Sequence, residues 1–379
     1  MLNAHHQRLR RAVRNFARFL TVNAAIAICA FDPSHAVAGS GVFYFADAHL
    51  QDCSRPAMNA GVSNVCGASI THIEQVSWAL GNGLKANQFS ELEALYQRWC
   101  TGQDRFADGS WKLGSLGRAW QTTFESRARW DADLSSLRAW QSQTSNSQMA
   151  LLAEMAYWRA YAWHARGQGY ARSVLPEGWK LFGTRLQEAM HAAERAFEND
   201  APKCPAVYSQ IIDILIDGGA PDEVLKNFYD THAKGFASYQ QLHLSMARHF
   251  EPRWGGSVEK YAAFVDQVVE LTRETEGTGM YARLYLVVDH PSRIPFEPDR
   301  ADSKGPTWPR LKKSYEDLLE RSPLSDWVRE HFLESTCRTE NHALYRRLRS
   351  EIIAKNYSVY GKHSLEVCDR MHGYLSATN

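Results

Sequence analysis

Residues 177–199 read EGWKLFGTRLQEAMHAAERAFEN, the longest helical pattern in the chain. Apolar residues recur there every three or four positions, which places them on one face of an α-helix. That face comprises Trp179, Leu181, Phe182, Leu186, Met190, Ala193 and Phe197. The stretch predicts a long amphipathic helix.

Similar patterns lie on both sides of this stretch. They begin at Phe89 and continue over Ser147–His164, Ala206–Ile216, Glu223–Lys234, Tyr239–His249, Val258–Thr275 and Met280–Val288. Glycine and proline interrupt the pattern between them, at Gly218, Gly219, Pro221, Gly235, Pro252, Gly255 and Gly256. Sustained strand-type alternation is nearly absent. The sequence therefore predicts an all-α fold.

Helix pairs joined by short turns are typical of α-solenoids and tetratricopeptide-like stacks. The spacing between helix starts is irregular here, so an ordinary irregular helical domain is the alternative. We predict a helical repeat-like core over residues 88–290, after a loop-rich, disulfide-tied cap over 39–87 that is rich in Gly, Asn and Ser. A proline-rich connector, 291–309, leads to C-terminal helices in 310–379.

Residues 1–38 have the pattern of a secretory signal peptide. A basic segment precedes the apolar run Phe19–Phe31, and small residues at 36 and 38 precede Gly39, as a cleavage site requires. Lipidation at Cys29 and an uncleaved anchor are the alternatives. The residue before this cysteine is not small, however, and the apolar run is shorter than a membrane-spanning helix. We expect cleavage, a periplasmic or secreted protein, and no membrane span afterwards.

Cleavage would leave an even number of cysteines in an oxidising compartment, which favours disulfides. They are Cys53, Cys66, Cys100, Cys204, Cys337 and Cys368. The shortest loops would join Cys53 to Cys66 and Cys337 to Cys368, and elimination then pairs Cys100 with Cys204. A metal site or a reactive thiol is the alternative, but no C-x-x-C spacing is present. We expect no metal and no cofactor.

The charge of the expected mature chain is close to neutral. Removing residues 1–38 lowers Lys+Arg from 43 to 38 and Asp+Glu from 42 to 41, which gives a net charge of −3. A nucleic-acid-binding protein normally carries a basic surface. The composition therefore argues against a nucleic-acid partner.

Several spaced motifs resemble a bacterial family known only as a domain of unknown function. They are Asp108-Gly-Ser-Trp111, Leu137-x-x-Trp140, Ala162-x-x-Ala-Arg-Gly167, Cys204-Pro205, Pro252-Arg-Trp-Gly-Gly-Ser257 and Glu276-Gly-x-x-x-Tyr-Ala-Arg283. The resemblance covers about residues 88–290. It implies a helical, repeat-like fold in secreted or envelope proteins and carries no catalytic residues.

Two of these motifs have simple structural explanations. In residues 252–257, the proline ends a helix, the glycines adopt backbone angles closed to other residues, and Ser257 caps the next helix. Tyr281 and Arg283 lie two residues apart and so point to different sides of a helix. We expect Tyr281 in the core and Arg283 paired with an acid such as Glu276. Arg253 and Trp254 on the rigid turn are candidate binding residues.

Tryptophan is unusually frequent, at positions 111, 120, 130, 140, 158, 163 and 179. Such side chains are typical core residues, but a row of aromatics with arginine also forms binding grooves and interface hot spots. The candidate binding residues are Trp140, Trp163, Arg166, Arg253, Trp254, Tyr281 and Arg283.

Catalytic motifs are absent from the sequence. There is no H-E-x-x-H and no G-x-S-x-G, and the His–Glu pairs at 191/194 and 331/334 have a spacing that occurs by chance. The sequence therefore predicts an exported protein that binds another envelope protein, as an immunity or adaptor protein does. A cell-wall or polysaccharide hydrolase with a tryptophan-lined groove is the alternative, and two facing carboxyl groups in that groove would distinguish it. A purely structural envelope component is a third interpretation.

Overall fold

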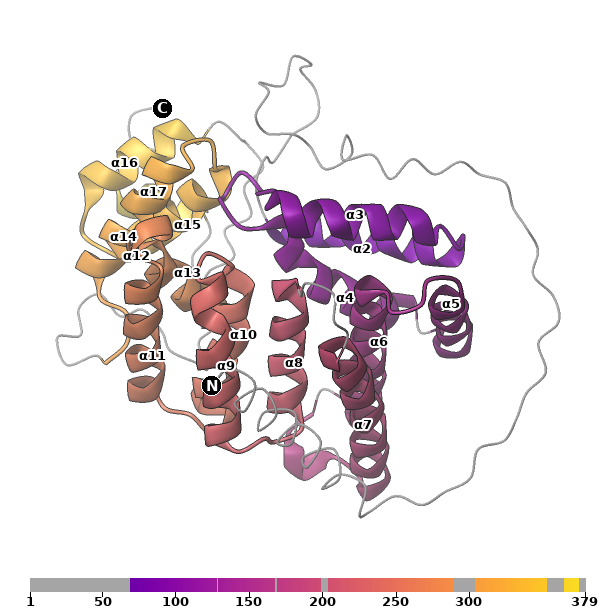
Figure 1. The fold of residues 1–379 in the computed structure, drawn as a ribbon. Coiled ribbons are helices and arrows are strands. Elements are labelled where there is room, and N and C mark those ends of the chain that lie inside the picture. The colour runs from indigo at the N-terminus through magenta and orange to yellow at the C-terminus, as the bar shows by residue number, and fades with distance from the viewer. Residues whose placement is uncertain are drawn as a thin grey trace. The chain divides into compact units, whose positions relative to one another are not determined.

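The computed structural model describes residues 69–127, 129–167, 169–198, 204–288, 304–352 and 365–374. Within these ranges every extended regular element is a helix (Figure 1), apart from an isolated bridge between Arg105 and Trp111. The predicted all-α class is thus confirmed for this part of the chain. The predicted signal peptide, as well as Cys53 and Cys66, lies outside it.

The chain divides into two compact units. Among the described residues, the first unit comprises 73–104 and 112–236, and the second comprises 69–72, 105–111 and 237–374. The division falls inside the predicted 88–290 core, because a short segment before Lys112 packs with helices that begin more than a hundred residues later. Each unit is described separately below.

The first unit is built from successive helices, with 3-10 turns at 112–114, 171–173 and 234–236. Helices α6 and α7 run side by side over much of their length (Figure 1), and α8 packs against both. The helices are α2 (Ser69–Lys85, assigned to this unit from residue 73), α3 (Phe89–Gly102), α4 (Ser115–Arg127), α5 (Trp130–Gln143), α6 (Gln148–Arg166), α7 (Pro176–Glu198), α8 (Pro205–Asp217) and α9 (Asp222–Ala233).

Helix α2 corrects the predicted loop-rich character of residues 39–87 over its own length, Ser69–Lys85. Val76, Leu80 and Leu84 recur every four residues and are all buried, which is the pattern of a core-facing helix. The glycines there suggested a loop, but Gly83 serves close packing: a Cβ at this position would lie 3.1 Å from a methyl carbon of Leu92 on α3. Small residues allow the two helices to approach.

The core of the first unit contains several tryptophans. Trp99, Trp120 and Trp140 are fully buried. Trp140 stacks on Phe89 with ring centroids 5.4 Å apart, and its indole N–H donates to Glu93 Oε1 at 2.8 Å. The candidate binding residue Trp140 is therefore a core residue.

In the second unit, helices that follow one another in sequence also pack on one another. Contacts join α10 to α11, α11 to α13, α13 to α14, α14 to α15 and α15 to α16. The helices are α10 (Gln240–Phe250), α11 (Val258–Leu271), α12 (Arg273–Glu276), α13 (Gly279–Val288), α14 (Trp308–Arg321), α15 (Asp326–Cys337), α16 (His342–Glu351) and α17 (Leu365–Met371).

The turn between α10 and α11 forms as predicted. Pro252–Trp254 is a 3-10 turn, Gly255 has φ +93°, and the Ser257 side chain accepts a hydrogen bond from the Lys260 N–H. A Cβ on Gly256 would lie 2.0 Å from the Phe250 carbonyl oxygen, so only glycine fits. The motif is a helix-to-helix connection.

Two predicted boundaries are corrected in this unit. Residues 291–309 were expected to exclude helix, but α14 begins at Trp308 and has Pro309 in its first turn. Proline fits there because the N–H groups of a first turn have no partner within the helix. The predicted helix Val258–Thr275 ends at Leu271, and α12 follows Thr272. Residues 289–303 of the connector lie outside the described ranges.

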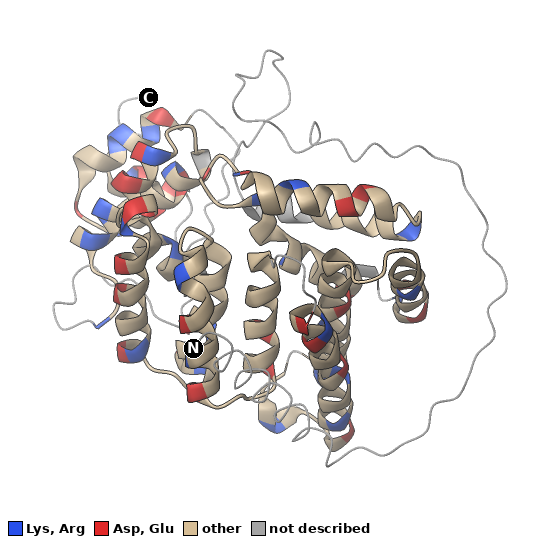
Figure 2. Ribbon diagram, viewed as in Figure 1, with Lys and Arg blue, Asp and Glu red and all other residues tan. Residues whose placement is uncertain are grey.

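Both signs of charge occur on the helices of each unit (Figure 2), in keeping with the near-neutral net charge of the sequence. Among the described helices, none is long and apolar enough to cross a membrane.

His243 on α10 makes the stability of the second unit sensitive to acid. Its ring is fully buried, Nε2 lies 2.8 Å from the Ala237 carbonyl oxygen, and burial lowers its pKa to about 4. A lowered pKa means that the fold favours the neutral ring, so this stabilisation is present above the ordinary pKa of about 6.5 and is lost below it.

We expect acidification from pH 7 to pH 4 to lower the free energy of unfolding by about 3 kcal/mol through His243 alone. His243→Gln retains a donor for the carbonyl and cannot take up the proton, so it should remove this part of the pH dependence. Urea unfolding of both proteins at the two pH values measures the difference. Parallel pH profiles would contradict the prediction.

Candidate functional site

The end of α6 and the start of α7 hold an arginine between two tryptophans. The Arg166 guanidinium carbon lies 4.9 Å from the ring centroid of Trp163 and 5.0 Å from that of Trp179. One guanidinium nitrogen, Nη1, donates to the carbonyl oxygens of Gly167 and Gly169, each at 3.1 Å. Gly167 has φ +75° and ends α6, so the chain turns and α7 returns alongside. Cation–π contacts and hydrogen bonds thus fix the arginine.

The connector between these helices and the first turn of α7 expose large apolar side chains. Tyr170 is 81% exposed, Leu175 74% and Trp179 40%. We refer to Trp163, Arg166, Tyr170, Leu175 and Trp179 together as the α6–α7 tip. Two of its members, Trp163 and Arg166, were predicted as binding residues, and the structure brings them into contact.

A second aromatic–arginine stack lies on another side of α6. Tyr161 is stacked on Trp130 with ring centroids 4.4 Å apart, and the Arg185 guanidinium lies 3.3 Å from the Tyr161 ring centroid. Arg185 also donates to the Tyr161 carbonyl oxygen at 2.8 Å. Burial lowers the pKa of Arg185. All three side chains are half-buried.

Trp163 connects the tip to a buried ion-pair cluster. Its indole N–H donates to Asp217 Oδ2 at 2.8 Å, and the same oxygen accepts from Arg159 Nε at 2.6 Å. Arg159 also contacts Asp213 at 3.4 Å and donates to Gln121 at 3.1 Å. Burial opposes the charge on Arg159, but Asp217 and Asp213 outweigh it and raise its pKa.

The carboxylates of this cluster are engaged by other side chains of the protein. The Asp217 side chain is only 1% exposed and its Oδ2 accepts from both the guanidinium and the indole. A glycoside hydrolase needs one protonated and one ionised carboxyl group facing its substrate. Here both aspartates are instead ion-paired with Arg159.

The remaining predicted binding residues lie in the second unit. Arg253 stacks on Trp254 at 4.7 Å from the ring centroid and lies 3.7 Å from Glu251. Tyr281 is buried, and its hydroxyl accepts a hydrogen bond from the Thr307 N–H at 3.1 Å. Tyr281 is therefore in the core, as expected.

Arg283 forms the ion pair that the sequence predicts and a further one. Its Nε lies 3.1 Å from Glu276 Oε2 and its Nη1 lies 3.5 Å from Asp108 Oδ2, and it also donates to the Asp108 carbonyl oxygen. Gln240 donates to Gly109 O at 3.2 Å and to Glu276. These buried contacts anchor residues 108–109 to α13, so Arg283 has a structural role.

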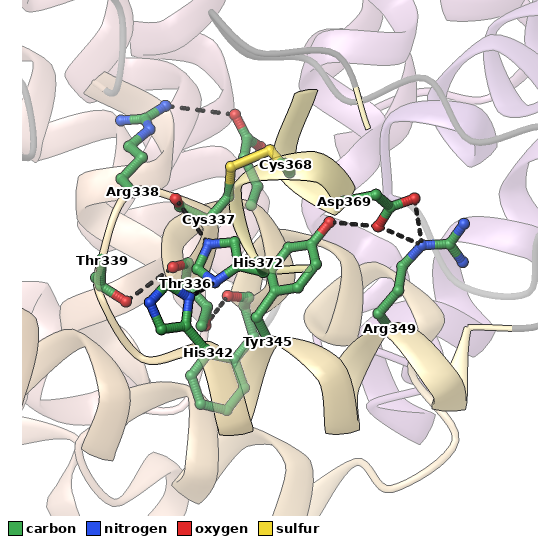
Figure 3. Close-up of a disulfide and its surroundings, with 12 residues drawn as sticks. Thr336, Cys337, Arg338, Thr339, His342, Tyr345, Arg349, Cys368, Asp369 and His372 are labelled. Carbon is green, nitrogen blue, oxygen red and sulfur yellow. Dashed lines mark hydrogen bonds and ion pairs between the residues drawn. A yellow bond between two sulfur atoms is a disulfide. The ribbon is translucent and has the colours of Figure 1, made fainter. Parts of the chain in front are cut away.

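Two of the predicted disulfides are present. Cys100 and Cys204 have Cα atoms 5.7 Å apart, and those of Cys337 and Cys368 are 5.5 Å apart. The second disulfide ties α17 to the end of α15, beside a cluster of His342, His372, Tyr345, Asp369 and Arg349 (Figure 3). The predicted Cys53–Cys66 pair lies outside the described residues.

Sequence reasoning missed several residues of these clusters. Tyr170 and Leu175 look like ordinary core residues in sequence, although the short connector around Gly167 and Gly169 is a signal of surface placement. Arg159 lies within an apolar helical pattern, where a charged residue indicates a buried partner. His342 and His372 are separated by 30 positions and carry no local signal.

No group of three or more potential metal ligands occurs among the described residues. No protein-family model, curated protein or solved structure matches the chain. The resemblance described above therefore stays a prediction.

Proposed function

We propose that this chain is an exported helical-repeat protein that binds a protein partner through the α6–α7 tip. The observation that carries the proposal is the exposure of Tyr170, Leu175 and Trp179 beside an arginine already fixed between two indoles. Tryptophan, tyrosine and arginine are the residues most enriched in interface hot spots.

Rigidity supports the same proposal. Binding costs free energy for every long side chain that must be ordered. The Arg166 side chain is held by two rings and two carbonyl oxygens, and the Trp163 indole is held by Asp217. These anchors are ordered before any partner arrives. A partner would therefore gain contact with them at a small entropic cost.

The basic residues in and beside the tip indicate which kind of partner surface would bind there. Arg166, Arg172 and Lys180 lie in or beside the tip, where Glu177 is the sole acidic residue between positions 166 and 187. An apolar pocket bordered by carboxylates would complement this surface in shape and charge. An envelope protein with such a pocket, for example a toxin that this chain occludes or a component that it recruits, is the partner that we propose.

The proposed location rests on the sequence pattern of residues 1–38 and on the two disulfides, which are typical of oxidising compartments. The repeat-like build rests on the successive packing of neighbouring helices in each unit. The hydrolase alternative lacks support, because the aspartates nearest the tip are held by Arg159.

The test begins with capture of partners from periplasmic extract of the native host by the non-reduced protein. Binding of the purified partner is then measured by calorimetry for wild type and for Tyr170→Ser/Leu175→Ser. Both side chains are exposed, so the double variant should fold normally. We expect its affinity to fall at least tenfold, which corresponds to about 1.4 kcal/mol.

Trp78→Ser is the matched control, since Trp78 on α2 is also an exposed aromatic. Its affinity should equal that of the wild type. Weaker binding on raising the salt concentration from 50 to 500 mM would support a partner pocket that is bordered by carboxylates. Equal affinity of wild type and the tip variant, or a tip variant that changes only self-association in light scattering, would overturn the proposal.

A further inference from the structure

Helix α17 is held in place by very little apolar packing. It has seven residues, of which Cys368 and Asp369 are buried, and the buried His372 follows directly. A helix this short is not stable in isolation. Its position therefore depends on the covalent and polar contacts that join it to α15 and α16.

These contacts form a compact set (Figure 3). Cys368 is bonded to Cys337 at the end of α15. Asp369 accepts hydrogen bonds from the Tyr345 hydroxyl at 2.8 Å and from Arg349 Nε at 3.1 Å. The third group is the His372 ring, which stacks on Tyr345 with ring centroids 4.1 Å apart.

The His372 ring is bonded at both nitrogens. Nε2 lies 3.1 Å from the Cys337 carbonyl oxygen, which is only an acceptor, so this nitrogen carries a hydrogen. The other nitrogen, Nδ1, lies 2.9 Å from Nδ1 of His342 on α16. In the neutral pair, His372 Nδ1 must then accept and His342 Nδ1 must donate.

The pair has room for one additional proton but not for two. A single added proton leaves one N–H donor and one acceptor between the rings. Two imidazolium rings would instead place two N–H groups against each other at the 2.9 Å separation. The hydrogen bond would be replaced by repulsion, at a site where one ring is buried.

Charged groups from each helix packed on His372 set the direction of its titration. Burial is the largest cause and lowers the His372 pKa. His342 and Arg346 on α16 lower it further, whereas the Cys337 carbonyl and Asp369 raise it in part.

The other charged groups near His372 are paired with one another. Arg349 is paired with Asp369, and Arg338 on α15 lies 3.4 Å from Glu334. The net effect favours the neutral ring. This stabilisation is present above pH 6.5 and is lost as the pH falls below that value.

We propose that the His342–His372 pair is an acid-sensitive latch, which docks α17 on α15 and α16 at neutral pH and releases it in acid while the Cys337–Cys368 disulfide keeps it attached. The latch lies in the second unit and is independent of the function proposed for the tip.

Hydrogen exchange of the full chain at pH 7.5, 6.5, 5.5 and 5.0 tests the latch, after correction for intrinsic exchange rates. Peptides covering 365–374 should lose protection as the pH falls, because the fold favours the neutral His372 ring. Peptides from α11, in the same unit, should lose much less protection, which separates release of α17 from the acid destabilisation expected from His243. Unchanged protection of 365–374 down to pH 5.0 would overturn the proposal.

A second readout needs no substitution. The rate at which a water-soluble phosphine reduces Cys337–Cys368 is compared with the rate for Cys100–Cys204 in the same sample, which cancels the pH dependence of the reagent. The ratio should rise on acidification. A constant ratio would contradict the release of α17.

The His372→Gln variant tests whether His372 is the residue that takes up the proton. Glutamine retains a donor near the Nε2 position and cannot become charged, so exchange in 365–374 should become independent of pH between 7.5 and 5.0. His191→Gln is the matched control, because His191 is a partly exposed histidine of the first unit that lies 3.6 Å from Glu188. It should keep the wild-type transition. A wild-type transition in His372→Gln would assign the effect elsewhere and overturn the latch.

Discussion

Replacing Cys100 and Cys204 together by alanine is expected to lower the free energy of unfolding of the first unit by about 4 to 5 kcal/mol. The two residues are 104 positions apart, so their disulfide closes most of the first unit into one loop and restricts the unfolded chain strongly. Cys204 is fully buried, and alanine avoids placing a hydroxyl group there. Urea unfolding of the non-reduced protein, followed by circular dichroism, measures the change.

The second disulfide provides the matched control. Cys337 and Cys368 are 31 positions apart, and the same relation predicts a loss smaller by about 1 kcal/mol for their double alanine variant. If the long loop were no more stabilising than the short one, restriction of the unfolded chain would not be the cause. A reducing agent should bring the wild type toward the stability of the variants.

Secondary structure was predictable where apolar periodicity was long and breakers were clear. The helix expected at 177–199 forms as Pro176–Glu198, and the one expected at 147–164 forms as Gln148–Arg166 with Ser147 as its N-cap. Composition misled where small residues serve packing. Gly83 permits close approach of α2 and α3, and Pro309 fits the first turn of α14, so neither marks a loop.

Local pairs were predictable and distant ones were not. Glu276 and Arg283 lie seven positions apart around one short turn, and their pairing follows from sequence. Asp108 is 175 positions from Arg283, so its contribution to that site becomes visible only in the fold. The same holds for Arg159, whose partner Asp217 is 58 positions away.

Exposure was the least predictable property. Trp140 and Trp179 belong to the same set of frequent tryptophans in the sequence, yet one is fully buried and the other is 40% exposed. Trp140 packs against the rings of Phe89 and Trp120 in the core. Trp179 lies in the first turn of α7, directly after the exposed connector. Amphipathic spacing alone does not show at which residue of a helix the buried part ends and the exposed part begins.

Arg159→Met is expected to lower the free energy of unfolding of the first unit by about 3 to 5 kcal/mol. Methionine fills a similar volume, but it leaves the carboxylates of Asp217 and Asp213 without their buried cation. Arg195→Met is the matched control on the neighbouring helix, because Arg195 is 50% exposed and pairs with Glu154. Its loss should stay below about 1 kcal/mol. Urea unfolding at pH 7 compares the two.

One further measurement separates charge from packing in this prediction. Adding Asp213→Asn and Asp217→Asn to Arg159→Met should recover much of the lost stability, because no unpaired charge then remains buried. If these two substitutions recover no stability, the arginine acts through packing alone. Trp163 would then depend on Asp217 only through its own hydrogen bond, and the tip would be rigid independently of the ion pair beneath it.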